Sequence, residues 1–295
     1  MVTGVMMMRS IAHRVRYAYP RWKYLRVAAR GTPMAVRLPK GITIRLYPWG
    51  QIAESISIYG FERTELALTA SLLKEGMNVI DIGANIGLYS LLASQLVGSS
   101  GHIWSFEPSS QTYAHLLMNL SLNSCDSVTA IQSALCDRSD GKILLKRSSG
   151  CSDAERYVDL YPNHPSGGHE PMADPGDDEL VDVTSLDSYA RRHLGGKRID
   201  FVKIDVEGCE YAVLQGAVAT LEANPGVVIL FECSWQGCQW AGRKTDDVFA
   251  LLESHGFSLF CWSRRMHGWE SSRESLRTAG NIWACRYRSL LPSLP

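Results

Sequence analysis

The stretch that decides the fold is Asn78-Val-Ile-Asp-Ile-Gly-Ala-Asn-Ile-Gly-Leu-Tyr-Ser90. Its first part, 79–82, is a short apolar, β-branched run interrupted only by Asp81, which is typical of a strand buried on both faces of a parallel sheet. Gly83 ends this run, and from Ile86 onward apolar residues recur with the spacing of a helix. The unit is therefore a strand, a glycine loop and a helix. In a doubly wound α/β sheet such a loop lies at the carboxyl end of a strand, where ligands bind.

The glycine loop limits which ligand it can hold. It reads Gly83-Ala84-Asn85-Ile86-Gly87, with Asn85 where a dinucleotide fingerprint would have its second glycine, and no phosphate-binding G-K-[ST] follows. The pattern suits a ligand that touches the backbone closely and carries no diphosphate. Amide groups at the helix start can bind a carboxylate, and Asp81 can meet an ammonium group or the loop backbone. A purely structural turn is the alternative.

A second acidic position follows the next predicted strand, His102–Phe106. Glu107 comes about 20 residues after the glycine loop, where an acidic side chain binds a ribose hydroxyl pair in nucleotide-binding α/β folds. A solvated strand-end glutamate is the alternative. The predicted third strand, 127–132, is followed by Ser133 and Ala134, where an adenine ring can bind. These features together predict S-adenosylmethionine as the cofactor.

The composition limits the partners, the compartment and the domain organisation that we expect for the chain. The 295 residues are 45% hydrophobic and have a formal net charge of zero, which gives no general attraction to nucleic acid or anionic membrane. None of the eight cysteines forms a C-x-x-C pair, which favours a reducing, cytoplasmic compartment and predicts no metal site and no disulfide framework. No apolar run approaches the length of a membrane span. We expect a basic N-terminal extension over residues 1–40 and a single domain over 41–290.

Two segments depart from the pattern of the domain. Residues 1–40 carry basic and aromatic side chains and no acidic ones, so they could bind RNA or acidic lipid or act as a transit peptide. We favour an extension that packs partly on the domain. The segment at about 148–180 is an irregular insertion whose His164 and His169 fit no zinc pattern, and we expect it to cover the substrate.

The second informative stretch is Ile199-Asp-Phe-Val-Lys-Ile-Asp-Val-Glu-Gly-Cys-Glu210. Lys203, Asp205 and Glu207 cluster at the end of an apolar strand. Placing ionisable groups there costs solvation energy unless the groups pair or perform a function. We therefore predict that they are catalytic. A structural Lys–Asp pair followed by a helix-capping Glu210 is the alternative.

Three segments together resemble the FkbM family of S-adenosylmethionine-dependent methyltransferases: VIDIGANIGLYS (79–90), FEP (106–108) and IDFVKIDVEGCEYAVLQGA (199–217). The K-I-D-V-E-G-x-E block is the specific part, because the glycine loop alone marks only the wider class I methyltransferases. The resemblance implies a doubly wound, seven-stranded, mostly parallel α/β sheet with an antiparallel edge strand. It also implies O-methylation of a hydroxyl on a small molecule such as a sugar or natural product, or on a glycan.

The resemblance also assigns roles to residues. The predicted cofactor-binding residues are Asp81, Gly83, Ala84, Asn85 and Gly87 at the methionine end, Glu107 at the ribose, and Ser133 and Ala134 near the adenine. Asp205 is the first candidate for the base that takes the acceptor's proton, and Glu207, Glu232 and His169 come after it. An RNA-modifying enzyme that uses the basic arm and a nicotinamide-dependent oxidoreductase remain as alternative functions. The sequence makes no prediction about oligomeric state.

Overall fold

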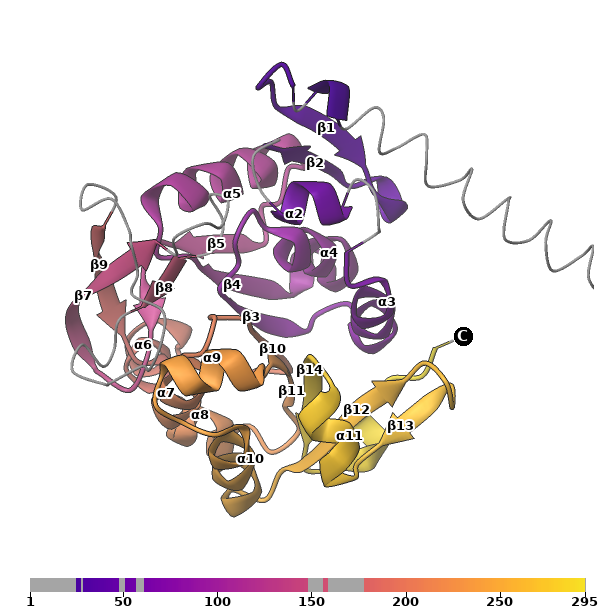
Figure 1. The fold of residues 1–295 in the computed structure, drawn as a ribbon, viewed down its shortest axis with the longest axis vertical. Coiled ribbons are helices and arrows are strands. Elements are labelled where there is room, and N and C mark those ends of the chain that lie inside the picture. The colour runs from indigo at the N-terminus through magenta and orange to yellow at the C-terminus, as the bar shows by residue number, and fades with distance from the viewer. Residues whose placement is uncertain are drawn as a thin grey trace, which may run out of the picture.

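The computed structural model describes residues 25–27, 29–47, 51–56, 61–147, 156–158 and 178–294. At its centre is an eight-stranded sheet with the order β13-β12-β14-β11-β10-β3-β4-β5 (Figure 1). In chain order these strands are β3 (Asn78–Ile82), β4 (His102–Phe106), β5 (Val128–Ile131), β10 (Phe201–Ile204), β11 (Val228–Glu232), β12 (Ser258–Ser263), β13 (Gly268–Glu270) and β14 (Asn281–Cys285).

The pairing confirms the doubly wound, mostly parallel α/β sheet. Strands β5, β4, β3, β10 and β11 run parallel, and β14 lies antiparallel between β11 and β12. β12 pairs antiparallel with β14 on its outer side, and β13, which pairs antiparallel with β12, is the antiparallel edge strand. The short β13 adds an eighth strand to the expected seven. It contains Trp269, whose ring centroid lies 5.2 Å from that of Trp262 and 5.5 Å from that of Trp283.

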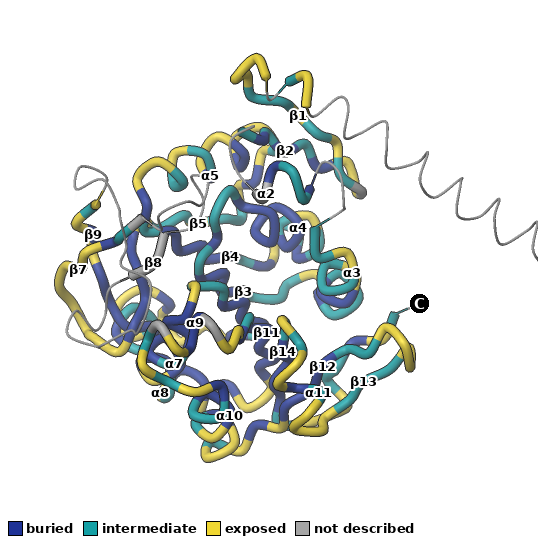
Figure 2. Tube along the Cα trace, in the orientation of Figure 1, coloured by how far each residue is buried: buried dark blue, intermediate teal, exposed yellow. Residues whose placement is uncertain are grey.

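Helices cover both faces of the sheet. They are α2 (Gln51–Glu54), α3 (Arg63–Leu72), α4 (Leu88–Val97), α5 (Ser110–Leu122), α6 (Leu186–Tyr189), α7 (Glu210–Gln215), α8 (Val218–Ala223), α9 (Trp235–Trp240), α10 (Thr245–Ser254) and α11 (Arg273–Thr278). Because side chains alternate along a strand, Ile80 of β3 packs in the cluster that contains Phe249 of α10, while Val79 packs with Leu68 of α3. Buried backbone therefore runs through the middle of the molecule (Figure 2). Among the described residues, no helix is long and apolar enough to cross a membrane.

The helix expected after Glu210 is divided in two at Gly216. An ideal Cβ at Gly216 would lie 2.0 Å from the carbonyl oxygen of Cys136, so the backbone here packs directly on the chain that follows β5. This contact connects the two helices α7 and α8 to a second, smaller sheet of order β6-β9-β7-β8. Its strands are β6 (Ala134–Leu135), β7 (Asp140–Arg147), β8 (Arg156–Val158) and β9 (Glu179–Thr184).

The second sheet therefore contains the described ends of the segment expected at 148–180. The strands β8 and β9 fall within or at the border of this segment, which was expected to be irregular. His164 and His169, which fit no zinc pattern, lie outside the described residues.

A hairpin packs beside α5 at the other end of the molecule. It consists of β1 (Met34–Arg37) and β2 (Thr43–Leu46). The side chain of Asn119 on α5 accepts from the Arg45 amide at 2.8 Å, and Asn123 accepts from the Thr43 amide at 2.8 Å. The domain boundary expected at residue 40 thus falls inside a hairpin, while the basic arm before residue 25 lies outside the described residues.

Candidate functional site

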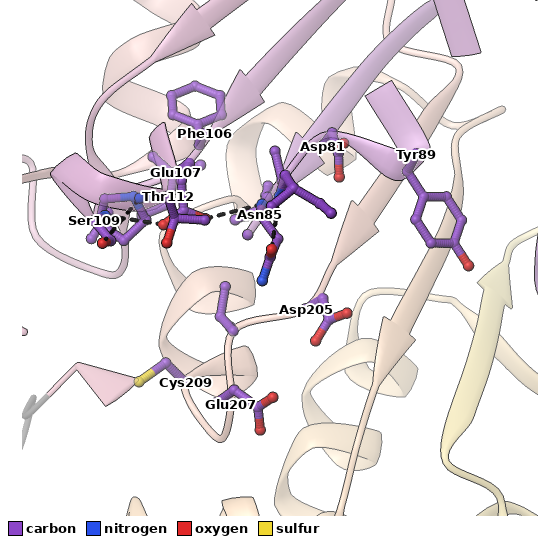
Figure 3. A pocket seen from close by; sticks show the side chains of 18 of the residues that line it. Asp81, Asn85, Tyr89, Phe106, Glu107, Ser109, Thr112, Asp205, Glu207 and Cys209 are labelled. Atoms are coloured by element: carbon purple, nitrogen blue, oxygen red, sulfur yellow. Dashed lines mark hydrogen bonds between the residues drawn. The ribbon is translucent and has the colours of Figure 1, made fainter. Parts of the chain in front are cut away.

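The strand order places a cavity at the centre of the sheet. The chain passes from β3 through β4 to β5 on one side and then returns to β10 on the other side of β3. This reversal is the point at which doubly wound sheets bind ligands. A cavity of about 280 Å³ lies there (Figure 3). The predicted site residues that line it are Asp81, Gly83, Ala84, Asn85, Glu107, Ser133, Ala134, Asp205 and Glu207; Gly87 and Lys203 lie behind the lining.

Both glycines of the loop are required by the backbone. Gly83 has φ +76°, and an ideal Cβ there would lie 1.8 Å from the carbonyl oxygen of Asp205. The loops after β3 and β10 can therefore approach each other only if residue 83 lacks a side chain. Gly87 has φ +95° at the N-cap of α4, and a Cβ there would lie 2.7 Å from Leu116 Cδ1. Asn85 between them also has a left-handed φ of +51°, which asparagine tolerates better than most residues.

The loop is held by its own hydrogen bonds. The amides of residues 83–87 all donate within the protein: those of Gly83 and Ala84 to the Phe106 carbonyl, that of Asn85 to Glu107, that of Ile86 to the Asn85 side chain, and that of Gly87 to the Ala84 carbonyl. These amides were expected to bind a ligand carboxylate. Because these five amides already have acceptors within the protein, the loop has a fixed shape and its amides are not available to a ligand carboxylate.

Glu107 has the position and the anchoring expected of a ribose ligand. Its side chain is 7% exposed; Oε2 accepts from the Asn85 amide at 3.0 Å, and Oε1 accepts from the Ser109 amide at 3.0 Å (Figure 3). These bonds fix the plane of the carboxylate at the edge of the cavity. A carboxylate oxygen can accept more than one hydrogen bond, so the anchored group is able to accept the two hydroxyls of a diol.

The far side of the cavity is apolar and belongs to the second sheet. Ser133 and Ala134 line it together with Leu135 and Leu145. The Ser133 hydroxyl donates to the carbonyl of Asp182 at 3.1 Å, which ties this wall to β9. Apolar walls with a few fixed polar groups suit a planar base such as adenine.

Asp81 lines the cavity, and its hydrogen bonds go to the first turn of α4. It is 2% exposed, and its carboxylate accepts from the Ser90 hydroxyl at 2.5 Å and from the Ser90 amide. Burial raises the pKa of Asp81 to about 6, against the lowering effects of Ser90 and the Lys203 charge. Asp81 therefore caps the first turn of α4 from inside the protein, and so fixes the helix to the strand.

Lys203 and Asp205 form a pair at the end of β10. The Lys203 Nζ lies 3.4 Å from Asp205 Oδ2 and 5.2 Å from the ring centroid of Tyr89. Burial lowers the pKa of Lys203, but the charges of Asp205 and other nearby carboxylates outweigh it and raise that pKa to about 12. The ammonium group thus stays charged while 1% exposed. Lys203 and Asp205 thus form the structural Lys–Asp pair that was the alternative to a catalytic role.

Sequence reasoning missed part of this cluster. Glu62, at the N-cap of α3, accepts from the Tyr89 hydroxyl at 2.6 Å and from Asn281 Nδ2 at 2.9 Å. One carboxylate oxygen each from Glu62, Asp205 and Glu232 lie within 4.8 Å of one another. Glu232, which follows an apolar strand as Glu107 does, was predicted as a candidate base, whereas Glu62 was not predicted. Glu62 belongs to a helix before the first core strand and carries no comparable local signal.

The same three carboxylates are the described residues that could share a cation. Lys203 already places a positive charge against Asp205, so the cluster is partly compensated by the protein itself.

The two glutamates that follow Asp205 have different surroundings. Glu207 is exposed, lines the cavity and has a left-handed φ of +48°. Glu210 is 2% exposed, and its Oε1 accepts from the Gly208 amide at 3.0 Å at the start of α7. Burial raises the pKa of Glu210 to about 7. Glu210 is therefore the helix-capping glutamate, and Glu207 remains a candidate for contact with substrate.

Comparisons with known proteins agree with this site. A family model described as the methyltransferase FkbM domain matches residues 81–259. Methyltransferase 1 of Beauveria bassiana is 28% identical over 200 residues, which cover 61% of this chain and 72% of that protein. Methyltransferase sdnD of Sordaria araneosa is 30% identical over 220 residues, which cover 68% of this chain and 80% of that protein.

Solved structures of methyltransferases are similar at a lower level. The methyltransferase FkbM from Methylobacillus flagellatus has a TM-score of 0.43 at 15% identity, covering 76% of this chain and 46% of that chain. An S-adenosylmethionine-dependent O-methyltransferase from Thermotoga maritima has a TM-score of 0.40 at 14% identity, covering 86% and 79%. Because the matching family model is that of a methyltransferase, it argues against the alternative function of a nicotinamide-dependent oxidoreductase. With a glycine loop, an anchored strand-end glutamate and a K-I-D-V-E-G-x-E block around one cavity, the chain belongs to the FkbM family of S-adenosylmethionine-dependent methyltransferases.

Proposed function

We propose that this methyltransferase transfers its methyl group to a hydroxyl oxygen of a sugar, a glycan or a natural product. The observation that carries the proposal is the pair of carboxyl groups, Asp205 and Glu232, in the lining of the cavity. A hydroxyl acceptor has to lose its proton during or after attack on the methyl group, so its enzyme benefits from a positioned base. A neutral amine already has a free electron pair, and it depends less on such a group.

Each part of the cavity has a role in this proposal. Glu107 accepts the ribose hydroxyls, and Ser133 and Ala134 border the adenine. The loop 83–87 borders the amino acid moiety. The remaining lining, with Asp205 and Glu232, is then left for the methyl group and the acceptor. Figure 3 shows Glu107 and Ser109 on one side of the cavity and Asp205 on another.

The protein contributes alignment and a proton acceptor. When bound, S-adenosylmethionine supplies the methyl group on a sulfonium. The walls of the cavity would hold the acceptor oxygen beside the methyl group, and fixing the geometry in advance lowers the barrier. Asp205 takes the hydroxyl proton as the oxygen–carbon bond forms, and Lys203 keeps its carboxylate oriented through the contact at 3.4 Å.

Matched acceptors test the proposal. Alcohols and amines of the same carbon skeleton are incubated with S-adenosylmethionine and the protein, and S-adenosylhomocysteine is quantified. We expect methylation of members of the alcohol series, confirmed by mass spectrometry of the product ether. Methylation confined to the amines would contradict the proposal.

The variant Asp205→Asn tests the role of the base. It keeps the shape of the side chain and removes its proton affinity, so we expect turnover to fall about 100-fold or more. The affinity for S-adenosylmethionine should change little in calorimetric titration. If affinity fell as much as turnover, Asp205 would be a cofactor-binding residue.

A further inference from the structure

The acidic cluster beside the cavity draws its members from three distant parts of the chain. Glu62 comes from the start of α3, Asp205 from the loop after β10, and Glu232 from the end of β11. Their nearest carboxylate oxygens lie within 4.8 Å, and Asp205 and Glu232 line the cavity. Like charges this close are unfavourable unless a proton or a cation separates them.

Among the described residues, the surroundings of Glu232 contain more acidic groups than cations. The charged and titratable groups of the packed elements are Lys203, Asp205 and Glu207 from β10 and the loop after it, Glu62 and Glu65 from the start of α3, Tyr89 from α4, Glu210 from α7, and Cys233 and Cys238 after β11. Across the β11–β14 ladder Glu232 faces Asn281, which is neutral and donates to Glu62. Arg264 lies 4.0 Å from Glu65, and Lys203 is the cation that acts on Glu232 itself.

The shortage of positive charge leaves a proton in the cluster. Burial raises the pKa of Glu232 to about 9, and the charges of Asp205 and Glu207 add to this effect beyond what Lys203 removes. A hydrogen bond joins Glu232 to Asp205. At neutral pH the pair is therefore one carboxylic acid and one carboxylate. In that form Glu232 cannot accept a proton from an acceptor.

The cofactor changes this charge balance. S-adenosylmethionine carries a positive sulfonium at the reacting end, whereas its product S-adenosylhomocysteine is neutral there. An opposite charge within about 4–6 Å favours the ionised form of an acid and shifts its proton affinity by 1–3 pH units. In the proposed placement, Asp205 and Glu232 lie in the part of the lining that is left for that end.

We infer that Glu232 and Asp205 form a proton-releasing pair, which loses its shared proton to solvent when the sulfonium binds and regains one from the acceptor during methyl transfer. Before transfer the pair has two negative charges opposite the sulfonium and Lys203. During transfer the acceptor's oxygen–hydrogen bond breaks, an oxygen–carbon bond forms and the carbon–sulfur bond breaks. The proton moves to the pair, which returns to one acid and one carboxylate. The base thus exists only while a charged methyl donor is present.

The release step is measurable without an acceptor. Wild-type protein is titrated calorimetrically with S-adenosylmethionine and with S-adenosylhomocysteine at pH 7.5, each in phosphate and in Tris. The dependence of the heat on the buffer gives the number of protons released. We expect about 0.2 to 0.9 of a proton more for S-adenosylmethionine. Its dissociation constant should also fall by up to tenfold per pH unit between pH 7 and 9.

A variant separates the pair from other titrating groups, including the cofactor's own amino group. In Glu232→Gln, we expect S-adenosylmethionine to bind but the additional proton release to disappear. The control is Glu222→Gln, an exposed glutamate hydrogen-bonded to His255, which should release protons as the wild type does. If the variant does not fold, the carboxyl carbon of Glu232 in ¹³C-glutamate-labelled wild-type protein reports the same ionisation by NMR.

Two results would overturn the inference. One is equal proton release for both ligands in the wild type. The other is a difference that persists unchanged in Glu232→Gln. The final transfer step rests on the proposed hydroxyl acceptor, but the release step rests only on cofactor binding. If no alcohol is methylated while release is observed, the acceptor assignment fails alone; if alcohols are methylated without release, this inference fails alone.

Discussion

At the scale of single residues, three non-glycine residues at the site have a left-handed backbone conformation, which glycine adopts more easily. Glu62, Asn85 and Glu207 have φ values of +44°, +51° and +48°. A left-handed conformation at a non-glycine residue costs about 1–3 kcal/mol. Such a cost at three positions around one cavity indicates that the side chains are needed there. Sequence rules place glycine at such positions, which is why they identified Gly83 and Gly87 but not Glu62.

The first residue-scale prediction concerns Gly83. In Gly83→Ala, the new Cβ meets the Asp205 carbonyl and the residue has to keep a positive φ. We expect a loss of about 3 kcal/mol or more in the free energy of unfolding, measured by denaturant titration. Gly226→Ala is the matched control, because nothing lies within 4 Å of its ideal Cβ. Equal stability of the two variants would contradict the close approach of the loops.

A second prediction concerns Glu107. In Glu107→Gln, one oxygen that accepts an amide hydrogen is replaced by a donor, and the charge that would bind the ribose is lost. We expect the affinity for S-adenosylmethionine to fall about 10- to 100-fold in calorimetric titration. Glu253→Gln, at an exposed pair with Arg273, should bind as the wild type does. Unchanged affinity in Glu107→Gln would place the ribose elsewhere.

At the scale of elements, the β1–β2 hairpin depends on α5 for its position. The Asn119 side chain is fully buried, accepts from the Arg45 amide and donates to the carbonyl of Ile86 at 2.8 Å. One amide thus connects β2, α5 and the glycine loop. The sequence suggested only a polar residue near a helix end, because its partners lie 74 and 33 residues away.

We therefore predict that Asn119→Ala is strongly destabilising. It leaves a half-buried amide and a half-buried carbonyl without this partner and a cavity where the Asn119 side chain was, which together cost about 2–4 kcal/mol in the free energy of unfolding. Because Ile86 is in the glycine loop, cofactor affinity should fall as well. Ser121→Ala on the exposed side of the same helix serves as control. If the two variants melted alike, Asn119 would not hold these elements together.

Local sequence patterns identified most elements of the sheet but not their long-range arrangement. The runs before Gly83 and Glu107 were predicted as strands because their apolar character is nearly continuous. The insertion of β14 between β11 and β12 depends on contacts far apart in the chain, for which no local pattern exists. The same difference applies to the site: Glu107 follows a spacing rule, whereas the contacts of Glu62 depend on the complete fold.

At the scale of the whole molecule, buried acids make stability depend on pH. The raised pKa of Glu210, about 7 against an ordinary value of 4.5, means that the folded state binds its proton more tightly than the unfolded state. Its contribution to stability is therefore full below pH 4.5, is lost as pH rises to about 7, and stays constant above that. The total loss is about 3 kcal/mol.

The variant Glu210→Gln tests this dependence. It can still accept from the Gly208 amide, and it cannot ionise. We expect its free energy of unfolding, relative to wild type, to rise by up to about 3 kcal/mol between pH 4.5 and pH 8. Denaturant titrations across this range measure the difference. If the free energies of unfolding of the two proteins changed with pH in the same way, the pKa of Glu210 would be the same in the folded and the unfolded state.

The hydrogen bond from Asn281 to Glu62 joins residues 219 positions apart. During synthesis on the ribosome, a chain that has emerged as far as the K-I-D-V-E-G-x-E block already contains the glycine loop, Glu107 and Asp205. It still lacks the strand that fixes Glu62 beside them. Contacts between such distant residues form late, because closing a long loop is entropically slow. A nascent chain can therefore build the cofactor pocket before it assembles the acidic cluster, which would delay methyl transfer until the domain is complete.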